Sequence, residues 1–299
     1  MKFVTAKLVE GIEFIGLVVG EQILHLKKAE TSIKREAIIP DTMIEAIGLG
    51  DLFFDRVSQI FSEIHEVNSE FIYDLSSIGL LAPIPYPRKN VFCIGKNYAD
   101  HAIEMGSSDD IPENIIVFTK APTAVVGSGA TIQNHRQITN QLDYEGELAV
   151  IIGKRGKAIS EEEARSHIFG YTIINDITAR DLQAKHKQFF LGKSLDSSCP
   201  MGPWIVHHSE IVDSNNLGIK TTINGDTRQD SNTNQMIFSV EKIISILSQG
   251  MTLEPGDIIA TGTPAGVGKG FKPPIYLKPG DKIEITLEGI GTLVNTIEE

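Results

Sequence analysis

The chain has 299 residues, of which 41% are hydrophobic and 22% are charged, a composition typical of a soluble globular protein with one or two domains. Its formal net charge of −12 argues against nucleic acid or an anionic membrane as a partner. Two cysteines, no apolar run long enough to span a membrane and no signal-like N-terminus together predict a cytoplasmic protein without a disulfide framework.

The first part of the chain is expected to form a small α+β domain. Residues 2–26 are predicted to form a β-hairpin that turns at Gly20-Glu21. From Asp41 to Glu66 the apolar residues recur at helical spacing. The segment "APIPYPRKN", with three alternating prolines, is typical of a stiff extended connector. We therefore predict two domains, residues 1–85 and residues 86–299.

Beyond the connector, the sequence predicts mostly strands. Asn224-Gly225 is a strong two-residue hairpin turn. Two Pro-Gly turns lead into the strand-like segments "GDIIA" and "GDKIEI". Helices are fewer, and are predicted over residues 161–168, where Ser160 and Glu163 form a capping box, 178–189 and 238–249. The expected fold class is a mixed, β-rich α+β fold.

The stretch "QLDYEGELAVIIG" combines a row of carboxylates with an apolar run. Asp143, Glu145 and Glu147 occupy alternate positions, so in a strand their side chains point to one face. A solvated face would explain them, but the residues that follow are apolar on both faces, which indicates a covered strand. Buried carboxylates without a partner are costly or take up protons, and a hard divalent cation removes that conflict. The sequence therefore favours a metal site, completed by a third oxygen ligand from elsewhere.

Asp176 is the candidate for that third ligand. It ends a short apolar strand in "YTIINDITARD", where helix capping is the alternative role for an aspartate. On the helix predicted to follow, Arg180, Gln183 and Lys187 fall on one face. That face begins beside Asp176 and could hold a carboxylate, although a solvated face would show the same pattern.

His101 and Glu104 fall three residues apart on a short predicted helix in "NYADHAIEMG". A glutamate beside a histidine holds its tautomer and raises its basicity, as a general base requires. A surface pair without a function is the alternative interpretation.

Two further segments are candidates for the site. Lys193 lies in an apolar stretch marked by Gly and Pro, where its ammonium group would be partly desolvated. The segment "ATGTPAGVGKG" does not meet the spacing of a nucleotide-binding loop. We expect it to bring Thr263 and backbone amides close to a small ligand.

These segments in this order resemble the fumarylacetoacetate hydrolase family over about residues 90–299. The likeness is greatest to short bacterial members that act on oxaloacetate and acylpyruvates. It implies a catalytic domain of rolled mixed β-sheets, a homodimer, and Mg²⁺ or Mn²⁺ as the cofactor. The implied roles are metal ligands for Glu145, Glu147 and Asp176, an acid–base pair on a lid helix for His101 and Glu104, and substrate contacts for Lys96, Tyr98, Arg180, Gln183, Lys193 and Thr263.

A site of this kind would act on a small anionic 2-oxo acid that chelates the cation. The cation and Lys193 would stabilise the enolate formed when a bond at C3 breaks. Oxaloacetate decarboxylation is the function ranked first. Acylpyruvate hydrolysis and oxaloacetate keto–enol tautomerisation are alternatives that differ in the group lost from C3. A non-catalytic dicarboxylate-binding protein is the alternative of another class, and the pairing of His101 with Glu104 speaks against it.

Overall fold

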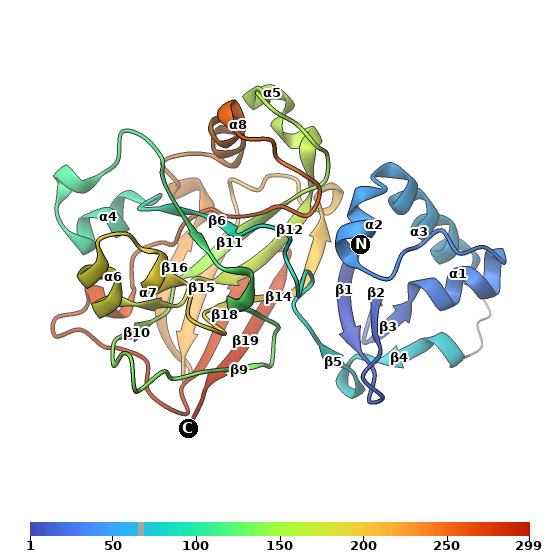
Figure 1. Cartoon of the computed structure of the whole chain (residues 1–299), viewed down its shortest axis with the longest axis horizontal. Helices are drawn as coiled ribbons and strands as arrows, with labels where there is room; N and C mark the ends of the chain where they lie inside the picture. The colour runs from blue at the N-terminus through green and yellow to red at the C-terminus, as the bar shows by residue number, and fades with distance from the viewer. Residues whose placement is uncertain (65–68) are drawn as a thin grey trace.

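A computed structural model describes residues 1–64 and 69–299. These residues form one large sheet of twelve strands, a sheet of five strands and a two-stranded ribbon (Figure 1). The eight α-helices of the described residues lie around the sheets. The predicted β-rich α+β class is therefore confirmed. None of the described helices is long and apolar enough to cross a membrane.

The strands and helices have the following bounds. The large sheet contains β1 (Lys2–Lys7), β2 (Glu13–Val19), β3 (Gln22–His25), β4 (Ile72–Asp74), β5 (Gly79–Leu80), β6 (Val91–Gly95), β7 (Ile116–Lys120), β8 (Val125–Val126), β11 (Gly146–Ile152), β12 (Ile168–Asn175), β14 (Cys199–His207) and β17 (Ile258–Ala260). The five-stranded sheet contains β9 (Thr131–Ile132), β15 (Gly218–Ile223), β16 (Asp226–Asn232), β18 (Lys282–Leu287) and β19 (Gly291–Ile297), and the ribbon pairs β10 (Leu142–Asp143) with β13 (Thr178–Ala179). The helices are α1 (Leu26–Lys34), α2 (Met43–Gly48), α3 (Asp51–Glu63), α4 (Ala99–Met105), α5 (Glu161–Ala164), α6 (Arg180–His186), α7 (Phe190–Lys193) and α8 (Val240–Gly250).

Strand β11 is covered on both faces, as its continuous apolar sequence predicts. Leu148 and Val150 face a core shared with the five-stranded sheet and α8. Ala149 and Ile151, on the opposite face, belong to a second core that includes residues of α2 and α3. The carboxylates just before and within β11 therefore lie at the edge of a dry interior.

The N-terminal residues are joined to the rest of the chain by the large sheet. β1 pairs antiparallel with β14, with Phe3 opposite Ile205. Phe3 also packs against Phe53 of α3 and Phe169 of β12, at ring-centroid distances of 5.2 and 5.5 Å. The boundary near residue 85 stays a prediction, and the hydrogen-bonded sheet is continuous across it.

The N-terminal elements agree only in part with the sequence analysis. The hairpin turn at Gly20-Glu21 is confirmed, because Val19 of β2 pairs with Gln22 of β3. The helical repeat from Asp41 to Glu66 is divided into α2 and α3 at Gly50, whose φ of +58° interrupts the helix. The last two residues of that repeat, 65 and 66, lie outside the described residues. Helix α1 was not predicted, because most of its residues are polar.

The later helices are shorter than predicted. Helix α5 ends at Ala164 and continues as one 3₁₀ turn, although Ser160 caps it as expected by accepting the backbone N–H of Glu163. Helix α6 begins at Arg180, because the two residues before it pair with β10 as a strand. Helix α8 matches the prediction within one or two residues at each end. The Asn224-Gly225 turn joins β15 and β16 as predicted.

Candidate active site

Two neighbouring strands bring three carboxylates together. Gly146 of β11 pairs with Asn175 of β12, so the residues beside them, Glu145 and Asp176, meet at the same end of the sheet. The backbone N–H of Asp176 donates to the carbonyl of Glu145 at 2.8 Å. One carboxylate oxygen from each of Glu145, Glu147 and Asp176 lies within 4.8 Å of the others, and all three residues are buried. Asp176 does not cap α6, whose N-cap is Ala179.

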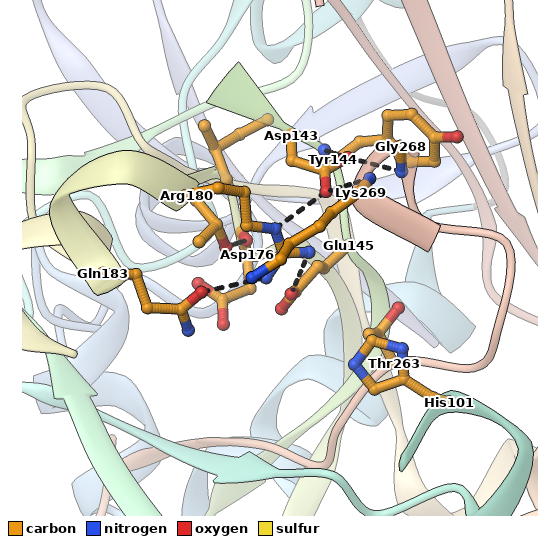
Figure 2. Close-up of polar contacts among 12 residues, drawn as sticks. His101, Asp143, Tyr144, Glu145, Asp176, Arg180, Gln183, Thr263, Gly268 and Lys269 are labelled. Carbon is orange, nitrogen blue, oxygen red and sulfur yellow. Dashed lines mark hydrogen bonds and ion pairs between the residues drawn. The ribbon is translucent and has the colours of Figure 1, made fainter. Parts of the chain in front are cut away.

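Asp143 does not join this cluster, so the expectation of three alternating carboxylates on one face is wrong for it. The strand is interrupted between β10, which ends at Asp143, and β11, which begins at Gly146, and Asp143 contributes no oxygen to the cluster. Oδ2 of Asp143 accepts from Arg180 Nε at 2.8 Å, while Oδ1 accepts the backbone N–H of Gly268 at 2.7 Å (Figure 2). Asp143 therefore holds the guanidinium group and a loop.

Buried cations contact two of the three carboxylates, Glu145 and Asp176. Lys193 Nζ lies 2.7 Å from Glu145 Oε2 and 2.6 Å from Asp176 Oδ2. Lys120 Nζ, with no exposed side-chain surface, lies 2.6 Å from the second oxygen of Asp176. Arg180 Nη2 lies 2.8 Å from Glu145 Oε1. The expectation of a partly desolvated Lys193 understates its burial, since the side chain is only 2% exposed. Lys120 was not predicted, because it ends an ordinary strand pattern.

The pKa values of the two glutamates of the cluster are shifted in opposite directions. Burial would raise the pKa of Glu145, but the charges of Lys193 and Arg180 outweigh burial and hold that pKa well below its usual range. Burial, with the nearby carboxylates of Asp176 and Glu145, raises the pKa of Glu147 well above its usual value. Convergent carboxylates that oppose one another's ionisation form a hard-oxygen donor set, and such a set fits Mg²⁺ or Mn²⁺.

His101 is buried and Glu104 is partly buried, so the two do not form a surface pair. Both lie on α4, and His101 Nδ1 is 3.3 Å from Glu104 Oε2. The other oxygen of Glu104 accepts the backbone N–H of Gly266 at 2.9 Å, which fixes the carboxylate. Because a carboxylate only accepts hydrogen bonds, it favours the proton on Nδ1 and leaves Nε2 as the basic atom.

The loop from Gly262 to Gly270 supplies backbone amides, but they bind carboxylates of the protein. Besides the amides given to Glu104 and Asp143, the N–H of Gly262 donates to Glu147 Oε2 at 2.8 Å. Gly262 has a φ of +103°, and a Cβ there would lie 2.7 Å from the Cβ of Asn97. Only glycine allows this close approach without displacement. These amides are therefore engaged by carboxylates of the protein, and the expectation that the loop brings Thr263 and backbone amides close to a ligand stays a prediction.

A cavity of about 300 Å³ opens onto the carboxylates. Most of the predicted residues line it: Lys96, His101, Glu145, Glu147, Arg180, Gln183, Lys193 and Thr263. Glu104 and Asp176 lie behind this wall and hold residues that line it. Tyr98 does not line this cavity; its ring is 1% exposed, and burial followed by the charge of Glu147 raises its pKa.

Several lining residues were not predicted, among them Phe118, Phe189 and Lys269. Phe118 lies beneath Lys193, whose Nζ is 4.9 Å from the ring centroid, and Phe189 packs edge-on against Phe118 at 5.5 Å. Lys269 enters the cavity from the glycine-rich loop. The cavity is therefore lined by both apolar and cationic side chains.

Comparison with known proteins identifies the family. The sequence profile described as "Fumarylacetoacetate (FAA) hydrolase C-terminal" matches residues 90–298. The chain belongs to the fumarylacetoacetate hydrolase family. It is similar to a curated relative, "Oxaloacetate tautomerase YisK" of Bacillus subtilis (strain 168), with 55% identity over 301 residues that cover 99% of this chain and 100% of the relative.

Solved structures of the family share the fold. A fumarylacetoacetate hydrolase from Exiguobacterium antarcticum superposes with a TM-score of 0.83 and 42% identity, covering 100% of this chain and 99% of the other. A maleylpyruvate hydrolase from Sphingobium sp. SYK-6, "in complex with manganese (II) ion and pyruvate", superposes with a TM-score of 0.78 and 27% identity, covering 100% and 99%. The predicted fold is confirmed.

Proposed function

We propose that this chain catalyses keto–enol tautomerisation of oxaloacetate, with Mg²⁺ or Mn²⁺ bound by Glu145, Glu147 and Asp176. The observation that carries the proposal is that one cavity is lined both by Glu145 and Glu147 of the carboxylate cluster and by His101 of the His101–Glu104 pair. The named activity of the Bacillus relative supports tautomerisation. Decarboxylation, ranked first from the sequence, has no comparable support.

The carboxylate cluster and His101 have different roles in the proposed reaction. When bound, the divalent cation would draw electrons from the keto group of a 2-oxo acid and make its C3 protons more acidic. His101 Nε2 would then take a C3 proton, while Glu104 stabilises the imidazolium that forms. Two of the three N–H groups of Lys193 face Glu145 and Asp176. The third can donate a proton to the keto oxygen. One proton leaves carbon and one reaches oxygen, so the reaction consumes no water.

Arg180 and Gln183 have separate roles in this proposal. Arg180 is engaged by Asp143 and Glu145, so it fixes a carboxylate of the cluster and is less available to a substrate. Its Nη1 also donates to Gln183 Oε1 at 3.3 Å. That contact turns the Gln183 amide so that its NH₂ group remains available to a substrate carboxylate.

The rate of enol loss, compared with the rate of pyruvate formation, tests the proposal. Purified protein with Mg²⁺ is given oxaloacetate enriched in the enol, and enol loss is followed by ultraviolet absorbance while pyruvate is measured by a coupled assay. We expect the enzyme to accelerate enol loss far more than pyruvate formation. Pyruvate formed as fast as the enol disappears would instead support decarboxylation, and efficient cleavage of acetylpyruvate would support the hydrolase alternative.

A further inference from the structure

The cationic side chains that line the cavity differ in whether they already have anionic partners. Arg180 and Lys193 are bound to carboxylates of the cluster. Lys96 Nζ pairs with Asp110 at 2.9 Å at the cavity edge. These three charges are therefore already balanced to a large extent by the protein.

Lys269 is the half-buried exception. Within residues 1–64 and 69–299, no carboxylate lies within ion-pair distance of its ammonium group. The same holds for Lys187, but that residue is exposed at the rim, whereas Lys269 is partly enclosed. Burial, followed by the charge of Arg180, lowers the pKa of Lys269. An anion that entered the cavity would relieve this repulsion.

The backbone of Lys269 is fixed beside the cluster. Its N–H donates to Asp143 Oδ2 at 3.0 Å, and Gly268 donates to the other oxygen of the same carboxylate. Asp143 also accepts a hydrogen bond from Arg180. The backbone of Lys269 and the guanidinium group of Arg180 are therefore held by the same carboxylate. Figure 2 shows the Lys269 side chain extending from the loop toward the side of the site where Arg180 and Gln183 lie.

We infer that Lys269 binds the second carboxylate of a dicarboxylate 2-oxo acid and so selects dicarboxylates over monocarboxylates. This inference rests on the proposed function, in which the first carboxylate and the keto oxygen lie at the Glu145–Glu147–Asp176 cluster. A second carboxylate that enters this partly enclosed cavity loses part of its hydration, and a nearby cation compensates that loss. Lys269 is the partly enclosed lysine of this cavity whose charge the described residues leave uncompensated. A monocarboxylate would leave the ammonium group of Lys269 without an anionic partner.

Matched unreactive ligands test this inference. Malate and lactate share a chelating 2-hydroxy acid group, and only malate has a second carboxylate. Calorimetry on Mg²⁺-loaded protein should show that Lys269→Gln weakens malate binding by about 10- to 100-fold, the loss expected for a hydrogen bond to a charged group. Lactate binding should stay nearly unchanged. Lys220→Gln, at an exposed lysine of β15 that does not line the cavity, is the matched control and should leave both affinities nearly unchanged, while Lys269→Arg should retain the preference for malate. In turnover, Lys269→Gln should raise KM for the enol of oxaloacetate more than it lowers kcat.

The outcomes separate this inference from the proposed function. Equal losses of malate and lactate affinity in Lys269→Gln, or no loss of either, would overturn the role of Lys269 even if the wild-type protein is a tautomerase. A wild-type protein that binds malate through Lys269 but does not accelerate enol loss would end the proposed function and leave the dicarboxylate site supported.

Discussion

Replacing Asp143 with asparagine keeps the size of the side chain but removes the charge opposite Arg180. Asp143 is fully buried and accepts four hydrogen bonds. Oδ2 accepts from Arg180 Nε at 2.8 Å and Lys269 N at 3.0 Å, and Oδ1 accepts from Gly268 N at 2.7 Å and Tyr144 N at 3.0 Å. An amide has one accepting oxygen, so one pair of donors loses its partner and meets an NH₂ group instead.

The cost of this substitution follows from these contacts. Removing one partner of a buried ion pair typically costs about 3–5 kcal/mol. Arg180 keeps its contact with Glu145, so we expect the lower end, about 3 kcal/mol, as a lower urea midpoint with an unchanged m-value. Mn²⁺ affinity should fall by at most about tenfold, because Asp143 acts on the cluster indirectly, through Arg180 and the loop that contains Gly268. Glu145→Gln, which removes a proposed ligand, should lose far more.

The matched control is Asp226→Asn, because Asp226 is 80% exposed and lies 3.8 Å from Arg228. This exposed pair should contribute little to the free energy of unfolding. An Asp143→Asn protein that unfolds at the wild-type urea concentration would refute the structural role of Asp143. Loss of Mn²⁺ binding in Asp143→Asn but not in Glu145→Gln would show that the two carboxylates have been assigned the wrong roles.

Three further predictions concern the base, the loop and the N-terminal part. His101→Ala should lower kcat for tautomerisation by about 10²–10⁴-fold, as expected for a general base, with Mn²⁺ affinity nearly unchanged; a wild-type kcat would exclude His101 as the base. Gly262→Ala places a Cβ 2.7 Å from the Cβ of Asn97 at a φ of +103°, so both the urea midpoint and Mn²⁺ affinity should fall, and unchanged values would show that the loop adapts freely. Burial, followed by the charge of a nearby lysine, lowers the pKa of His25 from 6.5 to about 4. The unfolded chain therefore binds the proton first, and stability should fall between pH 6.5 and 4 by at most about 3 kcal/mol. In His25→Asn, urea unfolding across this pH range should show a shallower slope, and an unchanged slope would contradict the assignment.

The sequence predicted the parts of the site that depend on local patterns. The apolar run of β11 indicated a strand covered on both faces, and the structure confirms that burial. Glu145, Glu147 and Asp176 lie close together, as expected, because paired strands place the ends of "YEGE" and "IIND" side by side. Their role as metal ligands stays a prediction.

The parts that were not predicted depend on tertiary contacts. Alternation assigns Asp143 to the same face as Glu145, but it does not reveal that the strand is interrupted between them. Lys120 follows an ordinary strand pattern, and its burial is decided by a carboxylate 56 residues away in the chain. Lys269 follows a glycine-rich loop, and only the fold of that loop around Asp143 directs it into the cavity.

The central claim is that Glu145, Glu147 and Asp176 bind a divalent cation on which tautomerisation depends. The most direct measurement is a titration of metal-stripped protein with Mn²⁺, in which bound ion is followed by electron paramagnetic resonance and enol loss is measured in the same samples. We predict a single bound Mn²⁺ per chain, a rate that rises in proportion to occupancy, and neither signal in Glu145→Gln. Full tautomerase activity in the stripped protein, with no Mn²⁺ bound, would contradict the account.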